Sequence, residues 1–391
     1  MNDITSYMLE QTKKILSIDS PTGFTAHAAE YVLGAYKKLG YDAKLTNKGG
    51  IFVCVNDGPD QADDPADAPI LLEAHMDTLG GMVCSINEKG RLMLSALGGM
   101  NPNNAEAENC RVYTRSGKVY SGTFQLKNAS IHVNGSYNDT ARSYDAMEVV
   151  LDEPVESKAD TEALGIMTGD IVCFDPRTRV TASGYIKSRF LDDKLSVGVL
   201  LGLAKYLHDT GKMPARRVYA HITVYEEVGH GGAGSVPSGV SEAISVDMGC
   251  VGDGLSCTEK QVSICVKDSG GPYSYEVVGK LIDAAKDLSI QVHPDDDYAR
   301  AHEGQNGKTE MWYVLSAEPD AFLYCGFSRD ISRDELKRRI ADNTLPEVLR
   351  RVNVKAGDTV FIPAGTIHAI CRGIVVAEVQ QSSNVTYLSL I

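Results

Sequence analysis

The pattern of apolar and polar residues changes character several times along the chain. Up to about residue 72, apolar residues three or four apart alternate with short apolar runs, a pattern typical of helices alternating with strands. An acidic, proline-containing stretch at 56–68 predicts a loop. The elements expected here are a helix ending near Ser20, a helix at 25–39, and strands at 42–46, 51–55 and 69–72.

Between about 82 and 183 the pattern becomes one of short β-type runs, such as 131–133 and 171–174, separated by Gly, Asn and Asp. This predicts an all-β barrel or sandwich. The α/β pattern returns near residue 190, so the all-β segment is expected to be an inserted domain. The elements predicted after it are helices at 194–208, 238–243 and 273–286, and strands at 217–225, 244–248 and 261–266. From 288 onward strands dominate, with one charged helix near 332–341.

Composition narrows the choice of partners. The chain has 391 residues and a formal net charge of −14, which argues against nucleic acid or an anionic membrane surface as the main partner. No apolar run approaches the roughly 18 residues that a membrane-spanning helix needs. The nine cysteines include no CxxC pair and are interpreted as reduced thiols. We therefore expect a cytoplasmic protein with no nucleic-acid or membrane partner.

Acidic residues and one histidine follow predicted strands in the α/β parts. In an open α/β sheet, ligands gather at the carboxyl ends of the strands. His75 and Asp77 follow one apolar strand, and an Asp192-Asp193 pair opens a helix. The other members of this group are Glu226, Glu227 and Asp247, at the ends of two further predicted strands.

These residue types suit two neighbouring divalent cations. Such a site needs a bridging carboxylate, further His or carboxylate ligands, and a carboxylate free to take a proton from water. Each motif also has a structural interpretation: His-x-Asp is often structural, Asp-Asp can be a helix N-cap, and Glu-Glu is usually solvated surface. Their common placement at strand ends favours the metal site.

The order of these motifs resembles the M42 family of metallo-aminopeptidases over about residues 5–285. The resemblance rests on HMDTLGG, FLDDK, YEEVGHGGAGS and VDMG, and on GIMTGDIV at the end of the β insert. It implies hydrolysis of the N-terminal peptide bond of a peptide by water at a two-metal site holding Zn or Co. The implied metal ligands are His75, Asp192 (bridging), Glu227 and Asp247, with Glu226 as general base and Asp77 orienting His75. The insert is expected to serve homo-oligomerisation and substrate access.

One element of that family's pattern is missing. The family carries a further histidine ligand on a late strand, and downstream of residue 285 no matching segment is found. The resemblance therefore implies an impaired site with weak or single-metal occupancy.

A second group of candidate metal ligands lies near the C-terminus. Gln291 and His293 alternate on one strand and share a face, and Glu310 on the next strand can face them. Two histidines, a glutamate and a glutamine make a plausible single zinc site. The second motif of a cupin barrel, G-x5-P-x-G-x2-H, is matched by Gly357, Pro363, Gly365 and His368.

This stretch resembles class I mannose-6-phosphate isomerase over about residues 281–387. The resemblance implies one zinc ion held by Gln291, His293, Glu310 and His368, an aldose–ketose isomerisation of mannose 6-phosphate, and Lys308 at the phosphate. Where that family carries an arginine after the position of Tyr387, this chain has Leu388. The isomerase's N-terminal strands and C-terminal portion are also missing.

The two resemblances meet at Lys280–Ala284, so the chain is interpreted as a chimera. The expected fold is α/β: a metallopeptidase sheet sandwiched by helices, with an inserted all-β domain, followed by a partial cupin-like barrel. The expected domains are 1–80 with 184–280, 81–183, and 281–391. Three functions stay open: a metal-dependent aminopeptidase, a mannose-6-phosphate isomerase, and a non-catalytic fusion, genuine or joined by error, with two incomplete sites.

Overall fold

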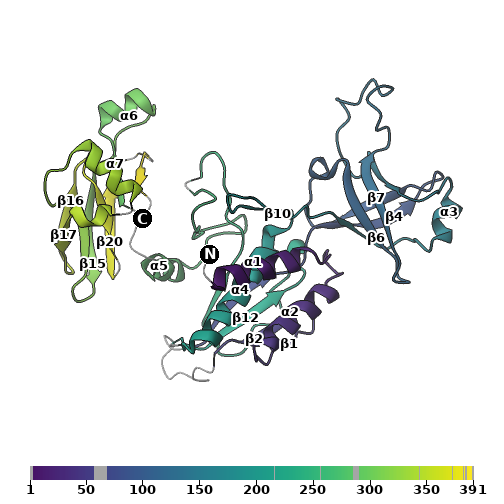
Figure 1. Ribbon diagram of the computed structural model, residues 1–391, viewed down its shortest axis with the longest axis horizontal. Coiled ribbons are helices and arrows are strands. Elements are labelled where there is room, and N and C mark those ends of the chain that lie inside the picture. Colours follow the sequence, from purple (N-terminus) through teal and green to yellow (C-terminus); the bar gives the residue numbers. More distant parts are fainter. Residues whose placement is uncertain are drawn as a thin grey trace. The chain divides into compact units, whose positions relative to one another are not determined.

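The chain divides into two compact units, unit 1 (Met1–Met248) and unit 2 (Gly249–Ile391). The computed structural model describes residues 3–56, 68–214, 216–255, 257–284, 290–342, 344–371, 373–381, 383 and 385–389 (Figure 1). Most of the predicted acidic loop at 56–68, and residues 285–289 just after the predicted junction, lie outside the described residues. No helix in the described part of the chain is long and apolar enough to cross a membrane.

Unit 1 is built on a five-stranded sheet in the order β1-β2-β12-β3-β13. β3 pairs in parallel with both β12 and β13, so the carboxyl ends of these three strands lie at one edge of the sheet. The strands are β1 (Lys44–Leu45), β2 (Ile51–Cys54), β3 (Ile70–His75), β12 (Val218–Thr223) and β13 (Glu242–Ser245).

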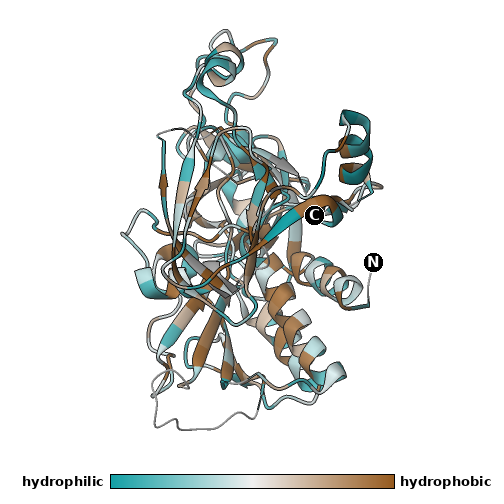
Figure 2. Ribbon diagram, turned by 90° about the vertical axis from the view of Figure 1, so that its left-hand side faces the viewer, coloured by the Kyte–Doolittle hydropathy of each residue, from teal (hydrophilic) through white to brown (hydrophobic). Residues whose placement is uncertain are grey.

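Three helices cover one face of this sheet: α1 (Asp3–Leu16), α2 (Ala26–Lys38) and α4 (Leu191–Thr210). Their buried residues form one apolar core with alternate residues of β2, β3 and β12, and Figure 2 shows apolar positions recurring along helices and strands. We expected helices on both faces of the sheet. Among the described residues of unit 1, helices cover one face only. The other face carries the polar pair Glu73 and His221, whose Oε1 and Nδ1 lie 2.6 Å apart.

The insert is a closed six-stranded antiparallel barrel in the order β4-β5-β8-β7-β6-β9. Of the two architectures expected, a barrel or a sandwich, the barrel is confirmed. Its interior is filled by one apolar core that includes Phe124 and Phe174. The short helix α3 (Lys158–Ala163) lies between β8 and β9, and a two-stranded ribbon of β10 (Arg179–Val180) and β11 (Ile186–Lys187) follows the barrel in sequence. The barrel strands are β4 (Gly80–Ile86), β5 (Leu92–Leu97), β6 (Glu108–Tyr113), β7 (Val119–Leu126), β8 (Met147–Leu151) and β9 (Ile171–Phe174).

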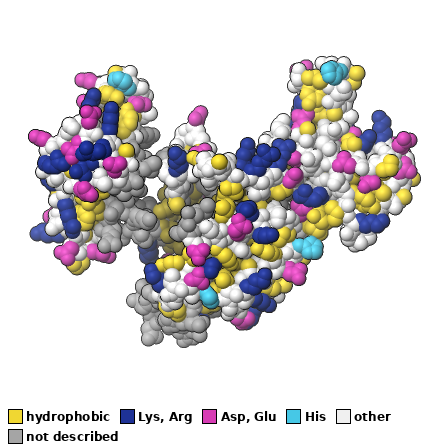
Figure 3. All heavy atoms as spheres, viewed as in Figure 1, with side chains coloured by type: hydrophobic (Ala, Val, Ile, Leu, Met, Phe, Trp, Pro, Cys, Tyr) yellow, Lys and Arg dark blue, Asp and Glu magenta, His cyan; other side chains and the backbone are white. Residues whose placement is uncertain are grey.

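Unit 2 contains two sheets, β17-β16-β19-β14-β21 and β18-β15-β20, whose apolar residues form a shared core around Trp312. Its helices are α5 (Tyr275–Ala284), α6 (Asp296–His302) and α7 (Arg333–Ala341), the last close to the predicted 332–341. The strands are β14 (Ile290–Val292), β15 (Glu310–Ala317), β16 (Phe322–Phe327), β17 (Leu349–Asn353), β18 (Thr359–Ile362), β19 (His368–Ile370), β20 (Ile374–Gln380) and β21 (Tyr387–Ser389). On the visible faces of both units, Lys and Arg side chains interleave with Asp and Glu (Figure 3).

Three sequence-based predictions of local structure are wrong. Residues 131–133 form a turn, and 261–266 form no strand; Val133 and Val262 are exposed. A strand needs a ladder of hydrogen bonds to a neighbouring strand, and neither segment pairs with a strand among the described residues. The predicted helix at 238–243 is instead a turn leading into β13. Gly239 has φ +88°, which a helix does not allow, and pairing of β13 with β3 decides the rest.

Candidate functional site

The parallel strands of unit 1 bring the predicted ligands together at their carboxyl ends. His75 is the last residue of β3 and is paired with Thr223 of β12, from which the chain reaches the short 3-10 turn Glu226–Val228. Asp247 lies two residues beyond the end of β13. This placement follows from the shared direction of the strands, as the sequence predicted.

His75 is the centre of this group. Its Nε2 lies 3.0 Å from Asp192 Oδ1, 3.6 Å from Glu226 Oε2 and 4.0 Å from Asp247 Oδ2. Ligand atoms within 4.8 Å of one another define two overlapping groups that could each hold a metal ion. One contains His75, Asp192 and Glu227, and the other contains His75, Asp193 and Asp247.

Asp193 is a site residue that the sequence analysis did not select. It is almost fully buried, and one of its oxygens accepts the backbone N–H of His75 at 3.0 Å. The signal available in the sequence was the Asp192-Asp193 pair itself. The pair alone does not tell which carboxylate faces the histidine, because that depends on the local backbone where α4 begins.

Asp77 connects the histidine to the turn that carries the two glutamates. Its Oδ1 lies 3.5 Å from His75 Nδ1 and accepts the Glu226 N–H at 3.1 Å. Its Oδ2 accepts the hydroxyl of Thr22 at 2.7 Å. Burial opposes ionisation of Asp77, but hydrogen bonds from His75 and Thr22 outweigh it and lower the pKa. Asp77 is therefore suited to orient His75 and the turn at once.

Replacing Asp77 by Asn is expected to weaken divalent-metal binding by unit 1 about 10- to 100-fold, the usual cost of losing a carboxylate that orients a ligating histidine. The amide keeps the volume but removes the charge that fixes the imidazole. Calorimetric titration with Mn²⁺ measures the effect, with Asp42→Asn, an exposed aspartate, as the matched control. An unchanged affinity in Asp77→Asn would show that Asp77 does not support the metal ligands.

The clustered carboxylates repel one another. Burial, followed by the charge of Asp192, raises the pKa of Glu227 to about 7. Burial also raises the pKa of Asp193 to about 8 and, to a lesser degree, that of Asp247. Burial alone would lower the pKa of His75, but its hydrogen bonds with Asp192 and Asp77 raise it to about 11. A divalent cation would relieve this repulsion, so one imidazole and several carboxylates fit such an ion.

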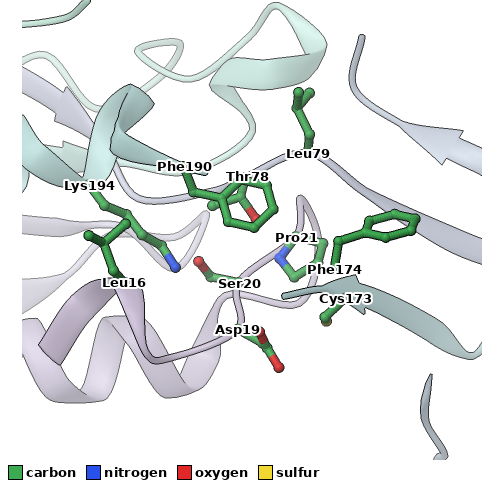
Figure 4. A pocket seen from close by; sticks show the side chains of 10 residues that line it. All are labelled: Leu16, Asp19, Ser20, Pro21, Thr78, Leu79, Cys173, Phe174, Phe190 and Lys194. Atoms are coloured by element: carbon green, nitrogen blue, oxygen red, sulfur yellow. The ribbon is translucent and has the colours of Figure 1, made fainter. Parts of the chain in front are cut away.

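A buried lysine connects the start of α4 to the segment that precedes Ser20. Lys194, next to Asp193, is almost fully buried, and its ammonium donates to the carbonyl oxygen of Ile18 at 2.6 Å. Burial lowers its pKa to about 8. Figure 4 shows its side chain extending toward Ser20, whose hydroxyl donates to the carbonyl oxygen of Met76 at 2.7 Å. The segment around Ser20 is thereby tied both to α4 and to the His75–Asp77 segment.

Unit 2 holds a second buried group of ligand type. His293, Glu310 and His368 place their ligand atoms within 4.8 Å of one another. The Nε2 atoms of the two histidines and both oxygens of Glu310 are buried and have no hydrogen-bond partner of good geometry. His293 Nδ1 lies 3.0 Å from the carbonyl oxygen of Val385, and His368 Nδ1 lies 2.8 Å from that of Thr366. Both rings thus direct Nε2 toward Glu310, a donor set that fits a zinc-type ion.

The remaining predicted residues of unit 2 lie around this group. Gln291 is paired with His368 across β14 and β19. Lys308 Nζ lies 2.6 Å from Glu310 Oε1, so its ammonium is directed at a predicted metal ligand; its predicted contact with phosphate stays a prediction. Glu378, which sequence reasoning missed, accepts the indole N–H of Trp312 at 2.9 Å. Burial and then the charge of Glu310 raise its pKa.

Comparison with known proteins confirms both resemblances. The family model described as M42 glutamyl aminopeptidase matches residues 55–304. The protein named "Putative aminopeptidase YhfE" of Bacillus subtilis (strain 168) is 39% identical over 290 residues, which cover 73% of this chain and 82% of that protein. The solved aminopeptidase APDkam598 from the archaeon Desulfurococcus kamchatkensis has a TM-score of 0.55 at 24% identity, covering 66% of this chain and 68% of that one. That last similarity concerns the fold alone.

The C-terminal part matches a different protein. Mannose-6-phosphate isomerase ManA of Bacillus subtilis (strain 168) is 45% identical over 114 residues, which are 29% of this chain. The chain spans 36% of the length of ManA.

Proposed function

The chain belongs to the M42 glutamyl aminopeptidase family, and from this we infer that unit 1 is a metal-dependent aminopeptidase that releases N-terminal residues from peptides. The observation that carries the proposal is the convergence of His75, Asp192 and Asp247 with the Glu226-Glu227 pair at the carboxyl ends of parallel strands. Hydrolysis at such a site needs metal ligands and a separate base, and this group supplies both.

The roles of the residues follow from their positions. His75, Asp192, Glu227 and Asp247 would hold one or two divalent ions, Zn or Co, and Asp193 belongs to the same ligand group as Asp247. Such ions acidify bound water and polarise a carbonyl oxygen. Glu226 belongs to neither ligand group, and burial raises its pKa, so its carboxylate is suited to accept a proton from water and return it to the leaving amine. Asp77 holds Glu226 in place through the backbone N–H.

The test is release of the first residue from a short peptide with a free α-amine, followed by mass spectrometry. We expect release that stops after chelation and returns when Co²⁺ or Zn²⁺ is added. The same peptide with an acetylated N-terminus should remain intact. Metal-independent cleavage, or equal cleavage of the acetylated peptide, would contradict an aminopeptidase of this type.

The second ion of the pair is expected to bind weakly. His75 is the only histidine in the two ligand groups of unit 1 among the described residues, whereas the family pattern includes a second one. The purified Glu310→Gln variant, in which the site of unit 2 is impaired, is therefore expected to retain about one ion after dialysis against metal-free buffer. Elemental analysis giving two retained ions per chain would contradict this expectation. A homo-oligomer built through the barrel stays a prediction, which light scattering would test.

Unit 2 has a second candidate function, which the buried group of His293, Glu310 and His368 favours: a zinc-dependent isomerase of mannose 6-phosphate. Because the matching segment covers about a third of the related isomerase, isomerisation by this chain is expected to stay at background. A coupled assay with mannose 6-phosphate, compared with His368→Ala, measures this. Turnover clearly above that of His368→Ala would show a working isomerase.

A further inference from the structure

A lysine outside the ligand groups contacts the loop behind Glu226. Lys48 lies in the tight turn between β1 and β2, where the N–H of Gly49 donates to Thr46 O at 3.0 Å and that of Thr46 to Gly50 O at 2.8 Å. A Cβ on Gly50 would lie 2.5 Å from the carbonyl oxygen of Ile222, so only glycine lets this turn pack against the end of β12. The turn is thereby fixed next to the strand that leads to Glu226.

The ammonium of Lys48 is directed at the segment that follows the Glu226-Glu227 pair. Its Nζ donates to the carbonyl oxygens of His230 and, at 3.3 Å, of Gly231. It also lies 3.2 Å from His230 Nδ1 and 5.7 Å from the centre of the Tyr225 ring. His230 stacks on that same ring with a centroid distance of 5.2 Å. The ammonium thus has two carbonyl acceptors within the loop, with a ring nitrogen of His230 beside it.

This loop packs directly on the proposed general base. The N–H of Gly229 donates to the carbonyl oxygen of Glu226 at 2.7 Å, and that of His230 to Tyr225 O at 3.1 Å. A Cβ on Gly231 would lie 3.1 Å from both Cα and Cβ of Glu226. The backbone at 229–231 therefore sets the space available to the Glu226 side chain, and a shift of this loop would move the carboxylate.

We propose that Lys48 is a positioning residue for the peptidase reaction, which holds loop 229–231 against Glu226 and so fixes the orientation of the base. The proposal rests on the proposed aminopeptidase function. Lys48 is not assigned as a substrate ligand in this arrangement, because its ammonium donates to the carbonyl oxygens of His230 and Gly231. Its effect should therefore appear in kcat rather than in KM, since misplacing a catalytic group by about 1 Å can cost about 100-fold in rate.

The experiment compares Lys48→Met and Lys48→Arg in the full chain loaded with Co²⁺. Lys48→Met is expected to lower kcat about 10- to 100-fold with little change in KM and in bound metal. Lys48→Arg, which can still donate to two carbonyls, should recover most of the loss. Lys44→Met is the matched control, since Lys44 lies on the same hairpin and pairs with the exposed Asp42, at 2.8 Å. Backbone hydrogen exchange over 226–234 should be faster in Lys48→Met alone.

The outcomes separate this proposal from the proposed function. A Lys48→Met enzyme with wild-type kcat, or one that changes only KM, would overturn the positioning role. So would an equal loss in Lys48→Arg together with a lower melting temperature in both, which would indicate a structural role. If the wild type shows no metal-dependent release of N-terminal residues, the proposed function fails. In that case hydrogen exchange remains as the test of whether Lys48 holds the loop. Unchanged exchange at 229–231 in Lys48→Met would refute that contact.

Discussion

The Glu226→Gln variant is expected to lose peptidase activity by about 10²- to 10⁴-fold in kcat, the range that a positioned general base contributes. The amide has nearly the same size and can occupy the same position beside His75 Nε2, 3.6 Å away, but it cannot accept the proton. Because Glu226 belongs to neither ligand group, metal affinity should change little. Initial rates and calorimetric metal titration on the same preparation measure both quantities.

Two further variants make this result specific. Glu227→Gln should lose metal affinity as well as activity, because Glu227 is a member of a ligand group. Glu30→Gln, on the exposed side of α2, should behave as wild type. If Glu226→Gln keeps its activity while Glu227→Gln loses it without losing metal, the roles of the two glutamates are exchanged. If neither variant loses activity, the site is not the peptidase centre.

The sequence predicted the position of the site better than its details. His75 and the Glu226-Glu227 pair could be located because each follows an apolar run, and parallel strands bring such ends together. Asp193 was missed because its neighbour Asp192 is chemically identical and only the backbone at the start of α4 separates their directions. Glu378 was missed because no spacing rule links it to His368.

The failures in local structure share a physical cause. The segment 261–266 alternates apolar and polar residues as a strand would, yet within the described part of the chain it pairs with no strand, and Val262 is 94% exposed. Residues 131–133 show the same pattern in a turn. Conversely, β13 begins at Glu242, inside the predicted helix at 238–243 and two residues before the predicted strand at 244–248, because β3 offers an edge for pairing. Periodicity reports what a segment can form, while the neighbouring strand decides whether it does.

Metal binding by unit 1 is expected to tighten with rising pH, by about tenfold per pH unit for each proton released between pH 6 and 8. The reason is that the ligands hold protons which an ion must displace. The pKa of Glu227 is raised by burial to about 7 and that of Asp193 to about 8, while His75 is held protonated by its hydrogen bonds, with its pKa at about 11. An ion entering the site replaces these protons, so its affinity depends on their concentration.

The same pKa values determine how the chelated protein responds to pH. The pKa of Asp193 is raised from 3.8 to about 8, and that of Glu227 from 4.5 to about 7. Between these values the folded state holds a proton that the unfolded state has lost, so the stability of the protein falls as pH rises toward the folded-state pKa. His75, raised from 6.5 to about 11, contributes stability that is complete below its unfolded pKa and is lost as pH rises through its folded pKa. Asp77 has the opposite sign, but its lowered pKa acts below its ordinary value of 3.8, outside this range. Between pH 6 and 9 the contributions of Asp193, Glu227 and His75 therefore all lower the stability of the chelated protein as pH rises.

Melting temperatures of the Glu310→Gln variant, with and without Mn²⁺ at pH 6 and pH 8.5, test this linkage with the ligand group of unit 2 impaired. The chelated protein should melt at a lower temperature at pH 8.5 than at pH 6, and the increase on adding Mn²⁺ should be larger at the higher pH. The same chain carrying Asp192→Asn as well should show little increase at either pH, because the carboxylate 3.0 Å from His75 Nε2 is gone. An Mn²⁺-dependent increase that is equal at both pH values would mean that the ligands are already deprotonated. The repulsion among Asp193, Asp247 and Glu227 would then not be what the ion relieves.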